Sequence, residues 1–193
     1  MSTAYLPERV IITDDHLRAR VLVSHHLESA TKLQENGDFF IFSGSYKNTP
    51  LSVVSTGSGK DDFIEALSLI KQLGALKVLY ISACISTTDR YDIKSLILGA
   101  GGSEQLIKRA LDTAKQQEID VQVKMIGTQD VASHHIVDDI TVALYDYTTK
   151  NKIEALALLT VSENSATGTK MEENEVRSRL YPTSGLAFEI MAE

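Results

Sequence analysis

The fold is decided by two stretches, Leu51-Ser-Val-Val-Ser-Thr-Gly-Ser-Gly-Lys60 and Val78-Leu-Tyr-Ile-Ser-Ala-Cys-Ile85. The first begins with an apolar run at 51–54 that is typical of a buried strand. Gly57 and Gly59 then interrupt the run and permit backbone angles closed to other residues. The second stretch begins with another apolar run, at 78–81, which also reads as a buried strand.

Between these two strands the spacing of apolar side chains changes to that of a helix. Over 63–73 they recur every three or four residues and give one apolar face. Gly74 stands where the glycine that follows a helix is expected. A strand, a loop, a helix and a second strand form the unit of a parallel α/β sheet. Ligands of such sheets bind beyond the carboxyl ends of the strands, so the predicted site involves 55–60 and 82–86.

The glycine loop does not match a nucleotide-binding motif. Thr56-Gly-Ser-Gly-Lys60 lacks the four residues that separate the glycines of a P-loop, and it lacks the third glycine of the dinucleotide fingerprint. A tight turn that holds no ligand remains the alternative for this loop taken alone.

Composition excludes several classes of protein. The 193 residues suffice for one well-buried domain and are few for two. The net charge of −7 argues against general binding of nucleic acid. No apolar run approaches the ~20 residues of a membrane span, and no signal-peptide core begins the chain. The single cysteine, Cys84, lies in an apolar run and indicates a buried thiol in a reducing compartment. We therefore expect a cytoplasmic protein with no membrane partner.

The remaining chain alternates between strand and helix patterns. A helix is expected after Thr13-Asp-Asp15, which offers N-cap side chains, and a hairpin turn is expected over 43–50. Further helices are expected from about 103 and over 136–147. Strands are expected at 10–12, 39–42, 93–98, 121–126 and 155–161. One domain over 1–193 is the economical interpretation.

Six motifs in this order resemble the superfamily of purine nucleoside and uridine phosphorylases, which includes related nucleosidases. The chain is shorter than typical members. The motifs are Ile11-Ile-Thr-Asp-Asp-His-Leu-Arg18, Phe42-Ser-Gly-Ser-Tyr-Lys47, Val54-Ser-Thr-Gly-Ser-Gly59, Leu73-Gly-Ala-Leu-Lys-Val-Leu-Tyr-Ile-Ser-Ala-Cys84, Ala114-Lys-Gln-Gln-Glu-Ile-Asp-Val121 and Leu159-Thr-Val-Ser-Glu163. The resemblance implies a single α/β domain with a mixed central sheet flanked by helices. It also implies a homo-oligomer, a dimer or a trimer of dimers, for which the phenylalanines at 39, 40 and 42 could supply apolar contact area.

The resemblance implies cleavage of the N-glycosidic bond of a nucleoside. A phosphorylase of this family holds phosphate against the sugar, and a carboxylic acid helps the base to leave. By position in the motifs, Arg18 corresponds to a phosphate-binding arginine and Glu163 to the leaving-group acid, where aspartate is usual. The remaining positions that correspond to substrate-binding residues are Thr56, Gly57, Ser82, Ala83 and Asp139.

The departures from the family pattern cluster where the phosphate would bind. Asp14 replaces a glycine and puts a carboxylate beside Arg18, with which it could form an internal ion pair. Tyr80 replaces an arginine, and Gly37 falls where some members lend an arginine to the neighbouring subunit. The second glutamate of the ribose-binding segment corresponds to Ile140. These substitutions make tight binding of phosphate doubtful.

Three hypotheses follow for the function. The first is a family member that binds a nucleoside or base with phosphorolysis weak or lost, or that serves as a non-catalytic structural or regulatory partner. The second is an N-glycosidic-bond hydrolase. The third is a phosphorylase with a relocated phosphate site. We expect no cofactor and no metal, since the adjacent histidines and aspartates at 134–135 and 138–139 point apart on a helix. Arg18 as an exposed helix cation and Glu163 as a solvated loop carboxylate or helix cap remain open alternatives.

Overall fold

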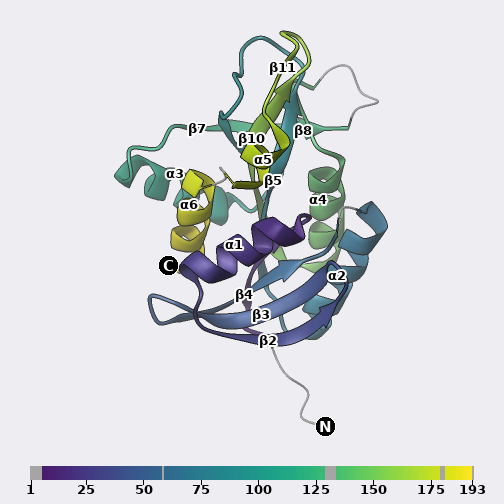
Figure 1. Cartoon of the computed structure of the whole chain (residues 1–193), viewed down its shortest axis with the longest axis vertical. Helices are drawn as coiled ribbons and strands as arrows, with labels where there is room; N and C mark the ends of the chain where they lie inside the picture. The colour runs from purple at the N-terminus through teal and green to yellow at the C-terminus, as the bar shows by residue number, and fades with distance from the viewer. Residues whose placement is uncertain (1–5, 58, 129–133, 179–180, 193) are drawn as a thin grey trace.

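The computed structural model describes residues 6–57, 59–128, 134–178 and 181–192, and Figure 1 shows their arrangement. Eleven strands of these residues belong to one mixed sheet, whose main path runs β2-β3-β4-β1-β5-β10-β6-β7. The strands are β1 (Arg9–Thr13), β2 (Glu28–Asn36), β3 (Phe39–Tyr46), β4 (Thr49–Ser55), β5 (Lys77–Ser86), β6 (Leu96–Gly99), β7 (Val121–Lys124), β8 (Ile126–Gly127), β9 (Ile136–Val137), β10 (Glu154–Asn164) and β11 (Thr169–Lys170).

The centre of the sheet is parallel, and this positions the candidate site. β1 pairs in parallel with β4 and with β5, and β5 pairs in parallel with β10. The carboxyl ends of these four strands therefore meet at one edge. Antiparallel strands flank this centre, with β3 on β4 and β6 on β10. The predicted mixed α/β fold is confirmed.

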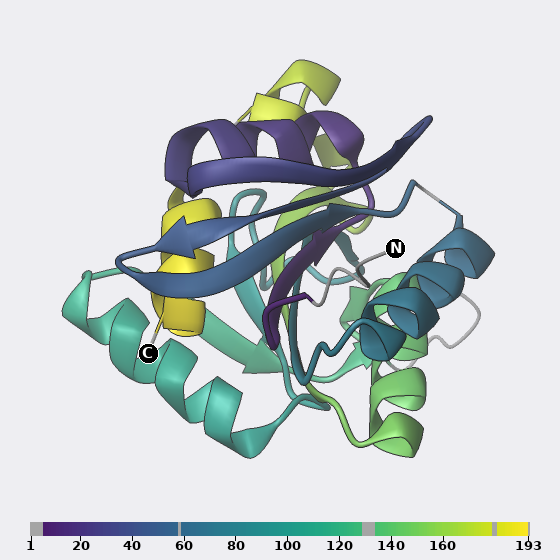
Figure 2. The ribbon, with the colours of Figure 1, turned by 90° about the horizontal axis from the view of Figure 1, so that it is seen from below.

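Helices cover both faces of the sheet, as Figure 2 shows. α2 and α4 pack on one face, where Phe63, Leu67 and Leu144 join a buried cluster with Val78 and Tyr80 of β5. α1, α3 and α6 pack on the other, where Leu22, Leu106 and Phe188 join a cluster with Leu79 and Ile81. The helices are α1 (His16–His26), α2 (Lys60–Gln72), α3 (Glu104–Gln116), α4 (Asp139–Asn151), α5 (Glu173–Ser178) and α6 (Tyr181–Ala192).

The strand–loop–helix–strand unit agrees with its prediction. β4 and β5 contain the predicted runs, and α2 buries Phe63, Ala66, Leu67 and Ile70 as its apolar spacing requires. Gly74 follows the helix with a φ of 109°, a left-handed conformation that favours glycine. Ser58 of the glycine loop lies outside the described residues.

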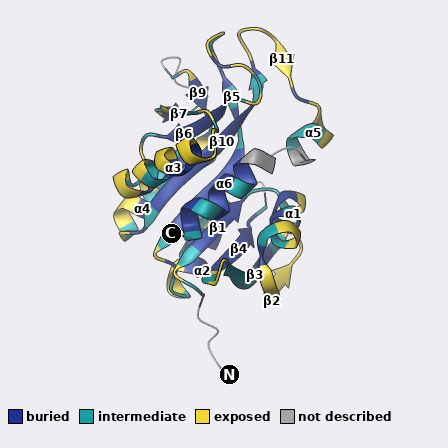
Figure 3. Cartoon of the chain, turned by 90° about the vertical axis from the view of Figure 1, so that its left-hand side faces the viewer, coloured by how far each residue is buried: buried dark blue, intermediate teal, exposed yellow. Residues whose placement is uncertain are grey.

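Several boundaries differ from the predictions for physical reasons. The strand expected at 93–98 is β6, which begins at Leu96 and ends at Gly99. The helix expected over 136–147 begins at Asp139, since Ile136 and Val137 pair with Ile126 and Gly127 as short strands. The strand β2 was not predicted: all nine of its residues are exposed, so its sequence shows no apolar period (Figure 3).

One expectation about the surface is wrong. Phe40 is 0% exposed and packs in the core beside Leu51 and Val53, so it cannot contribute contact area to another subunit. Phe39 and Phe42 are only partly buried. The described helices include none with both the length and the apolar character needed to cross a membrane.

Candidate active site

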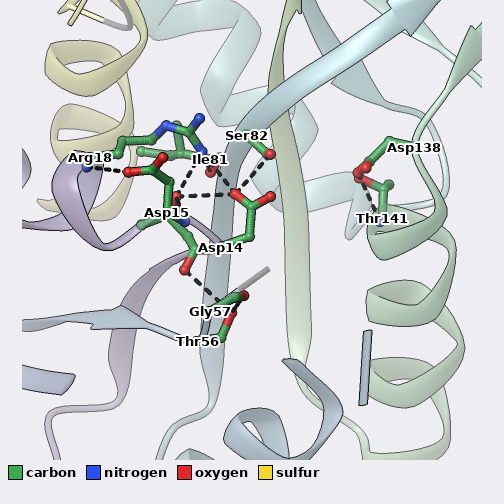
Figure 4. Close-up of polar contacts among 10 residues, drawn as sticks. Asp14, Asp15, Arg18, Thr56, Gly57, Ile81, Ser82, Asp138 and Thr141 are labelled. Carbon is green, nitrogen blue, oxygen red and sulfur yellow. Dashed lines mark hydrogen bonds and ion pairs between the residues drawn. The ribbon is translucent and has the colours of Figure 1, made fainter. Parts of the chain in front are cut away.

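The candidate site lies at the edge where the parallel strands β1, β4 and β5 end (Figure 4). Thr13, the last residue of β1, is paired in register with Ser55 of β4. The backbone N–H of Thr56 continues this pairing and donates to the carbonyl of Thr13 at 3.1 Å. Since β1 and β4 end side by side, Asp14, which follows β1, lies close to the loop that begins at Thr56 after β4.

Arg18 points into this edge rather than toward solvent. Asp15 caps α1 by accepting a hydrogen bond from the Arg18 backbone N–H at 2.8 Å, which confirms the predicted N-cap region. The Arg18 side chain then reaches back, and Nη1 donates to Thr13 Oγ1 at 2.9 Å and to the carbonyl of Ile81 at 3.3 Å. Arg18 is only 4% exposed, which contradicts the alternative of an exposed helix cation.

The predicted ion pair between Asp14 and Arg18 is confirmed. Arg18 Nη1 lies 2.8 Å from Asp14 Oδ1. The same carboxylate oxygen accepts a hydrogen bond from Ser82 Oγ at 3.0 Å. The site thus holds an anion that belongs to the chain, bonded to a guanidinium and a hydroxyl, which are both groups that bind phosphate in proteins.

Tyr80 lies two residues before Ser82 on strand β5 and is fully buried. Its ring packs edge-to-face on Phe63 of α2, with the centroids 5.0 Å apart. Its hydroxyl is buried and makes no hydrogen bond of good geometry with any described residue, although the Ser82 side chain lies near enough to lower its pKa. Burial raises the pKa of Tyr80 well above its usual value, and the charges of Asp14 and Asp138 raise it further. The tyrosine therefore stays neutral and supplies no cation.

Asp138 is a site residue that the sequence interpretation did not select. It caps α4, and its Oδ2 accepts from the backbone N–H of Thr141 at 2.9 Å and from Thr141 Oγ1 at 2.5 Å. Burial raises the pKa of Asp138 to about 6, and the charge of Asp14 adds to the rise. The pattern of an aspartate three residues before a threonine at a helix start is the sequence signal that could have identified it.

Asp139, which was predicted to bind substrate, is the first residue of α4 and is exposed. Its neighbour Asp138 is the carboxylate that turns inward. Adjacent residues at the start of a helix point in different directions, so only one of these two carboxylates reaches the interior. The role of Asp139 stays a prediction.

Glu163 lies apart from the Arg18 cluster. It pairs in register with Ile85 of β5, three residues beyond Ser82, which corresponds to roughly 10 Å along a strand. Its carboxylate forms an ion pair with Lys170 Nζ at 2.9 Å across the β10–β11 hairpin. Glu163 is therefore at the predicted edge of the sheet and engaged in an ion pair, and its catalytic role stays a prediction.

Thr56 and Gly57 connect the edge of the sheet to a groove. Thr56 Oγ1 donates to the carbonyl of Gly57 at 2.8 Å, and Gly57 has a φ of 81° that favours glycine. Both residues line a groove of about 620 Å³ between α2 and the β2–β3 turn, with Asp38, Asp62 and Leu69 among its other walls. Ala83 lies within β5, paired with Thr160 of β10.

Comparisons with known proteins place this fold and site in context. No family model matches the chain. The purine nucleoside phosphorylase DeoD-type of Clostridium beijerinckii is 26% identical over 208 aligned positions, which cover 89% of this chain and 88% of the relative. That of Caldanaerobacter subterraneus subsp. tengcongensis is 26% identical over 220 positions, covering 96% and 95%.

The fold is also that of a solved structure. The crystal structure of the purine nucleoside phosphorylase from Toxoplasma gondii in complex with immucillin-H superposes with a TM-score of 0.86. The match covers 100% of this chain and 92% of the other at 15% sequence identity, so it bears on the fold. The related sequences and the ordered motifs support the nucleoside phosphorylase superfamily as the group that this chain resembles over most of its length.

Proposed function

We propose that this protein binds a nucleoside or a nucleobase at the carboxyl edge of β1, β4 and β5, and that its phosphorolysis is weak or absent. The family relationship supports the first part of the proposal. The single observation that carries the second part is the ion pair of 2.8 Å between Arg18 and Asp14.

Phosphate would meet a guanidinium whose Nη1 is already bonded to groups of the protein, although its buried Nε has no partner among the described residues. Arg18 is 4% exposed, and its Nη1 is bonded to Thr13, Asp14 and Ile81. A phosphate at this position would have to displace the Asp14 carboxylate or lie beside it. Two like charges 4 Å apart repel by about 1 kcal/mol even in water, and by more in a partly buried site. Binding of phosphate is therefore opposed by the protein's own carboxylate.

The neighbouring positions add no compensating charge. Tyr80 stands where the family resemblance expects an arginine, and its neutral ring is packed on Phe63. The hydroxyl of Ser82, another group suited to an anion, donates to Asp14. Farther along this edge, the Lys170 cation is likewise already paired with a carboxylate, that of Glu163. These contacts favour a ligand without phosphate.

A second candidate function is hydrolysis of the N-glycosidic bond. Hydrolysis requires water in place of phosphate, so the Asp14–Arg18 pair does not oppose it. The observation that favours it is Asp138, whose pKa of about 6 lets a buried carboxyl group hold or release a proton near neutral pH. Glu163 is the other carboxyl group proposed for this role. A phosphorylase with a relocated phosphate site, and a non-catalytic structural or regulatory partner, are the further alternatives.

We also propose that the protein is a homo-oligomer, as the family resemblance implies, either a dimer or a trimer of dimers. Strand β2 is an edge strand whose nine residues are all exposed, Leu33 among them at 40%. Exposed edge strands are common sites of pairing with another chain. Light scattering at micromolar concentration tests this proposal, and a monomeric mass would contradict it.

The function is tested by incubating the protein with inosine, adenosine, guanosine and uridine, with and without phosphate, and measuring the release of base by chromatography. Binding of the same nucleosides is measured by calorimetry. The proposal expects binding of at least one nucleoside without rapid phosphate-dependent release. Release that does not require phosphate and is lost in Glu163→Gln or Asp138→Asn would support the hydrolase. Rapid phosphate-dependent release would refute the proposal.

A further inference from the structure

A groove of about 620 Å³ opens from the candidate site at Thr56 and Gly57, between α2 and the turn that joins β2 to β3. This volume lies within the range of roughly 300–1,000 Å³ that is usual for binding sites of small molecules. Because Thr56 and Gly57 follow β4 at the carboxyl edge of the sheet, the groove is continuous with that edge. A ligand that reaches the edge can therefore extend into the groove.

The two walls of the groove differ in origin and combine polar with apolar side chains. One wall is a stripe of α2 whose members are spaced by three or four positions and so share one face of the helix. Its residues are Asp62, Glu65, Ala66, Leu69 and Gln72. The opposite wall consists of Gln34 and Asn36 of β2, and of Asp38 and Phe39 where β3 begins.

Two aspartates lie close to Gly57, where the groove meets the edge of the sheet. A Cβ atom placed on Gly57 would lie 3.9 Å from Asp62 Oδ2 and 4.0 Å from Asp38 Cβ. Since Gly57 has no side chain, this space stays open, and its φ of 81° disfavours any other residue there. Asp38 Oδ1 lies 3.4 Å from His16 Nδ1, whereas the Asp62 carboxylate has no hydrogen-bond or ion-pair partner in the described part of the chain. Asp62 can therefore accept hydrogen bonds from a ligand.

The charge of the walls determines the kind of ligand that fits. Three carboxylates, those of Asp38, Asp62 and Glu65, line the groove, and its described walls contain no lysine or arginine. A carboxylate only accepts hydrogen bonds, so a matching ligand brings donors and no negative charge. The hydroxyl groups of ribose are such donors, and carboxylates bind them in other nucleotide-binding folds. The side chains of Phe39 and Leu69 offer an apolar surface to a flat base.

We propose that this groove holds the nucleoside, with a ribose hydroxyl donating to Asp62 and the base against Phe39 and Leu69. The inference rests on the proposed function, because it names where the same ligand lies and which class of nucleoside fits. Ile140 stands where the family resemblance expects a ribose-binding glutamate, and Asp62 supplies a carboxylate from another element. The groove then selects a ribonucleoside over a deoxyribonucleoside and over a nucleotide.

The first test compares ligands. Calorimetry at pH 7 measures the affinities of inosine, adenosine, guanosine and uridine and, for each one that binds, of its 2′-deoxy form and its 5′-monophosphate. We expect the 2′-deoxy form and the monophosphate each to bind roughly tenfold or more weakly than the ribonucleoside. Equal affinities for the three forms would overturn the proposal.

Asp62→Ala tests the contact with ribose. The residue is exposed in the first turn of α2, where alanine is well tolerated. We expect the difference in affinity between the ribonucleoside and its 2′-deoxy form to fall to within about threefold. Asp61→Ala is the matched control, since Asp61 is exposed in the same turn and does not line the groove, and it should leave the difference intact. A difference that survives Asp62→Ala would overturn the assignment.

Glu65→Lys tests the selection against phosphate by adding a function. The substitution puts a cation into the groove at an exposed position of α2, and lysine and glutamate are comparable helix formers. We expect the monophosphate to gain roughly tenfold in affinity relative to the nucleoside. Asp61→Lys changes the net charge equally outside the groove and should alter this ratio by no more than about twofold. Equal changes in the two variants would mean that the ligand lies elsewhere.

The outcomes separate this inference from the function on which it rests. A nucleoside whose binding is unaffected by Asp62→Ala and by Glu65→Lys refutes the groove alone. Rapid phosphate-dependent release of base refutes the proposed function, whereas calorimetry measures the place of binding independently. If no nucleoside binds, both proposals are wrong, and binding of spermidine in that case would show that the carboxylates hold a polyamine instead.

Discussion

The guanidinium of Arg18 is bonded to the carboxylate of Asp14 at 2.8 Å, four residues earlier in the chain. Local sequence therefore supplies both the cation and the anion of this site. Since Arg18 is almost completely buried, its charge requires a partner whether or not a ligand is present. Asp14 gives the site a partner that is always present, and the arginine contributes to the stability of the fold.

Removal of Arg18 should destabilise the protein. Arg18→Ala leaves Asp14 without its cation and removes one hydrogen-bond donor each from Thr13 Oγ1 and the carbonyl of Ile81. We expect a loss of about 2–4 kcal/mol in the free energy of unfolding, measured by urea denaturation. Arg20→Ala is the matched control, because the ion pair of Arg20 with Glu35 lies on the surface of the same helix, and it should cost under about 1 kcal/mol. Equal losses in both variants would contradict this account.

Removal of the Tyr80 hydroxyl should not destabilise the free protein. Tyr80→Phe keeps the edge-to-face contact with Phe63 and deletes a buried oxygen that has no partner. Deletion of an unpaired polar atom is expected to raise the free energy of unfolding by up to about 1 kcal/mol. Urea denaturation measures the change. A loss of more than about 1 kcal/mol would mean that the hydroxyl is hydrogen-bonded in solution.

The raised pKa of Asp138 predicts a specific dependence of stability on pH. The pKa is about 6 in the folded protein, above the value of roughly 4 expected for the unfolded chain. The folded state therefore holds a proton that the unfolded state releases, and the resulting stabilisation is present below about pH 4 and lost as pH rises through 6. Asp138 interacts electrostatically with Asp14, Tyr80, Cys84 and Tyr145, and hydrogen bonds from Thr141 and Ile140 partly oppose the rise of its pKa.

Asp138→Asn removes this titration and keeps the cap of α4. Relative to the native protein, its free energy of unfolding should rise by up to about 3 kcal/mol between pH 4 and pH 7.5. Denaturant titrations at several pH values measure the difference. Asp146→Asn, on the exposed side of the same helix, should show no such rise. A difference that does not change with pH would show that Asp138 is not desolvated.

The sequence predicted the parallel centre of the fold because its signals are local. The valine-rich run before Gly57 and the apolar spacing of α2 are each sufficient to identify their element. The edge strand β2 carries no such signal: it is held by pairing with β3, and its side chains contact mainly solvent. Pairing between strands depends on residues distant in sequence. A strand whose residues are all exposed does not show the alternation of apolar and polar residues by which strands are predicted.

The sequence predicted the contact between Asp14 and Arg18. It did not predict which residues from distant parts of the chain lie near them. Asp14 precedes the N-cap Asp15 of α1 and Arg18 lies in the first turn, so their proximity follows from a separation of four residues at the start of a helix. The choice between Asp138 and Asp139 depended on where α4 begins, and helix boundaries are uncertain by one or two residues from sequence. The packing of Tyr80 on Phe63 depends on the register of β5 against α2, which no local pattern specifies.

The central claim is that the carboxylate of Asp14 occupies the position at which phosphate would bind. Calorimetric titration of inorganic phosphate into the native protein and into Asp14→Gly with Tyr80→Arg tests it most directly, with the exposed Asp61→Asn as the control for a change of charge elsewhere. We predict weak or undetectable binding by the native protein and by the control, and a gain of roughly tenfold or more in the double variant. Tight binding by the native protein that is abolished in Arg18→Ala and is not improved in the double variant would contradict the claim.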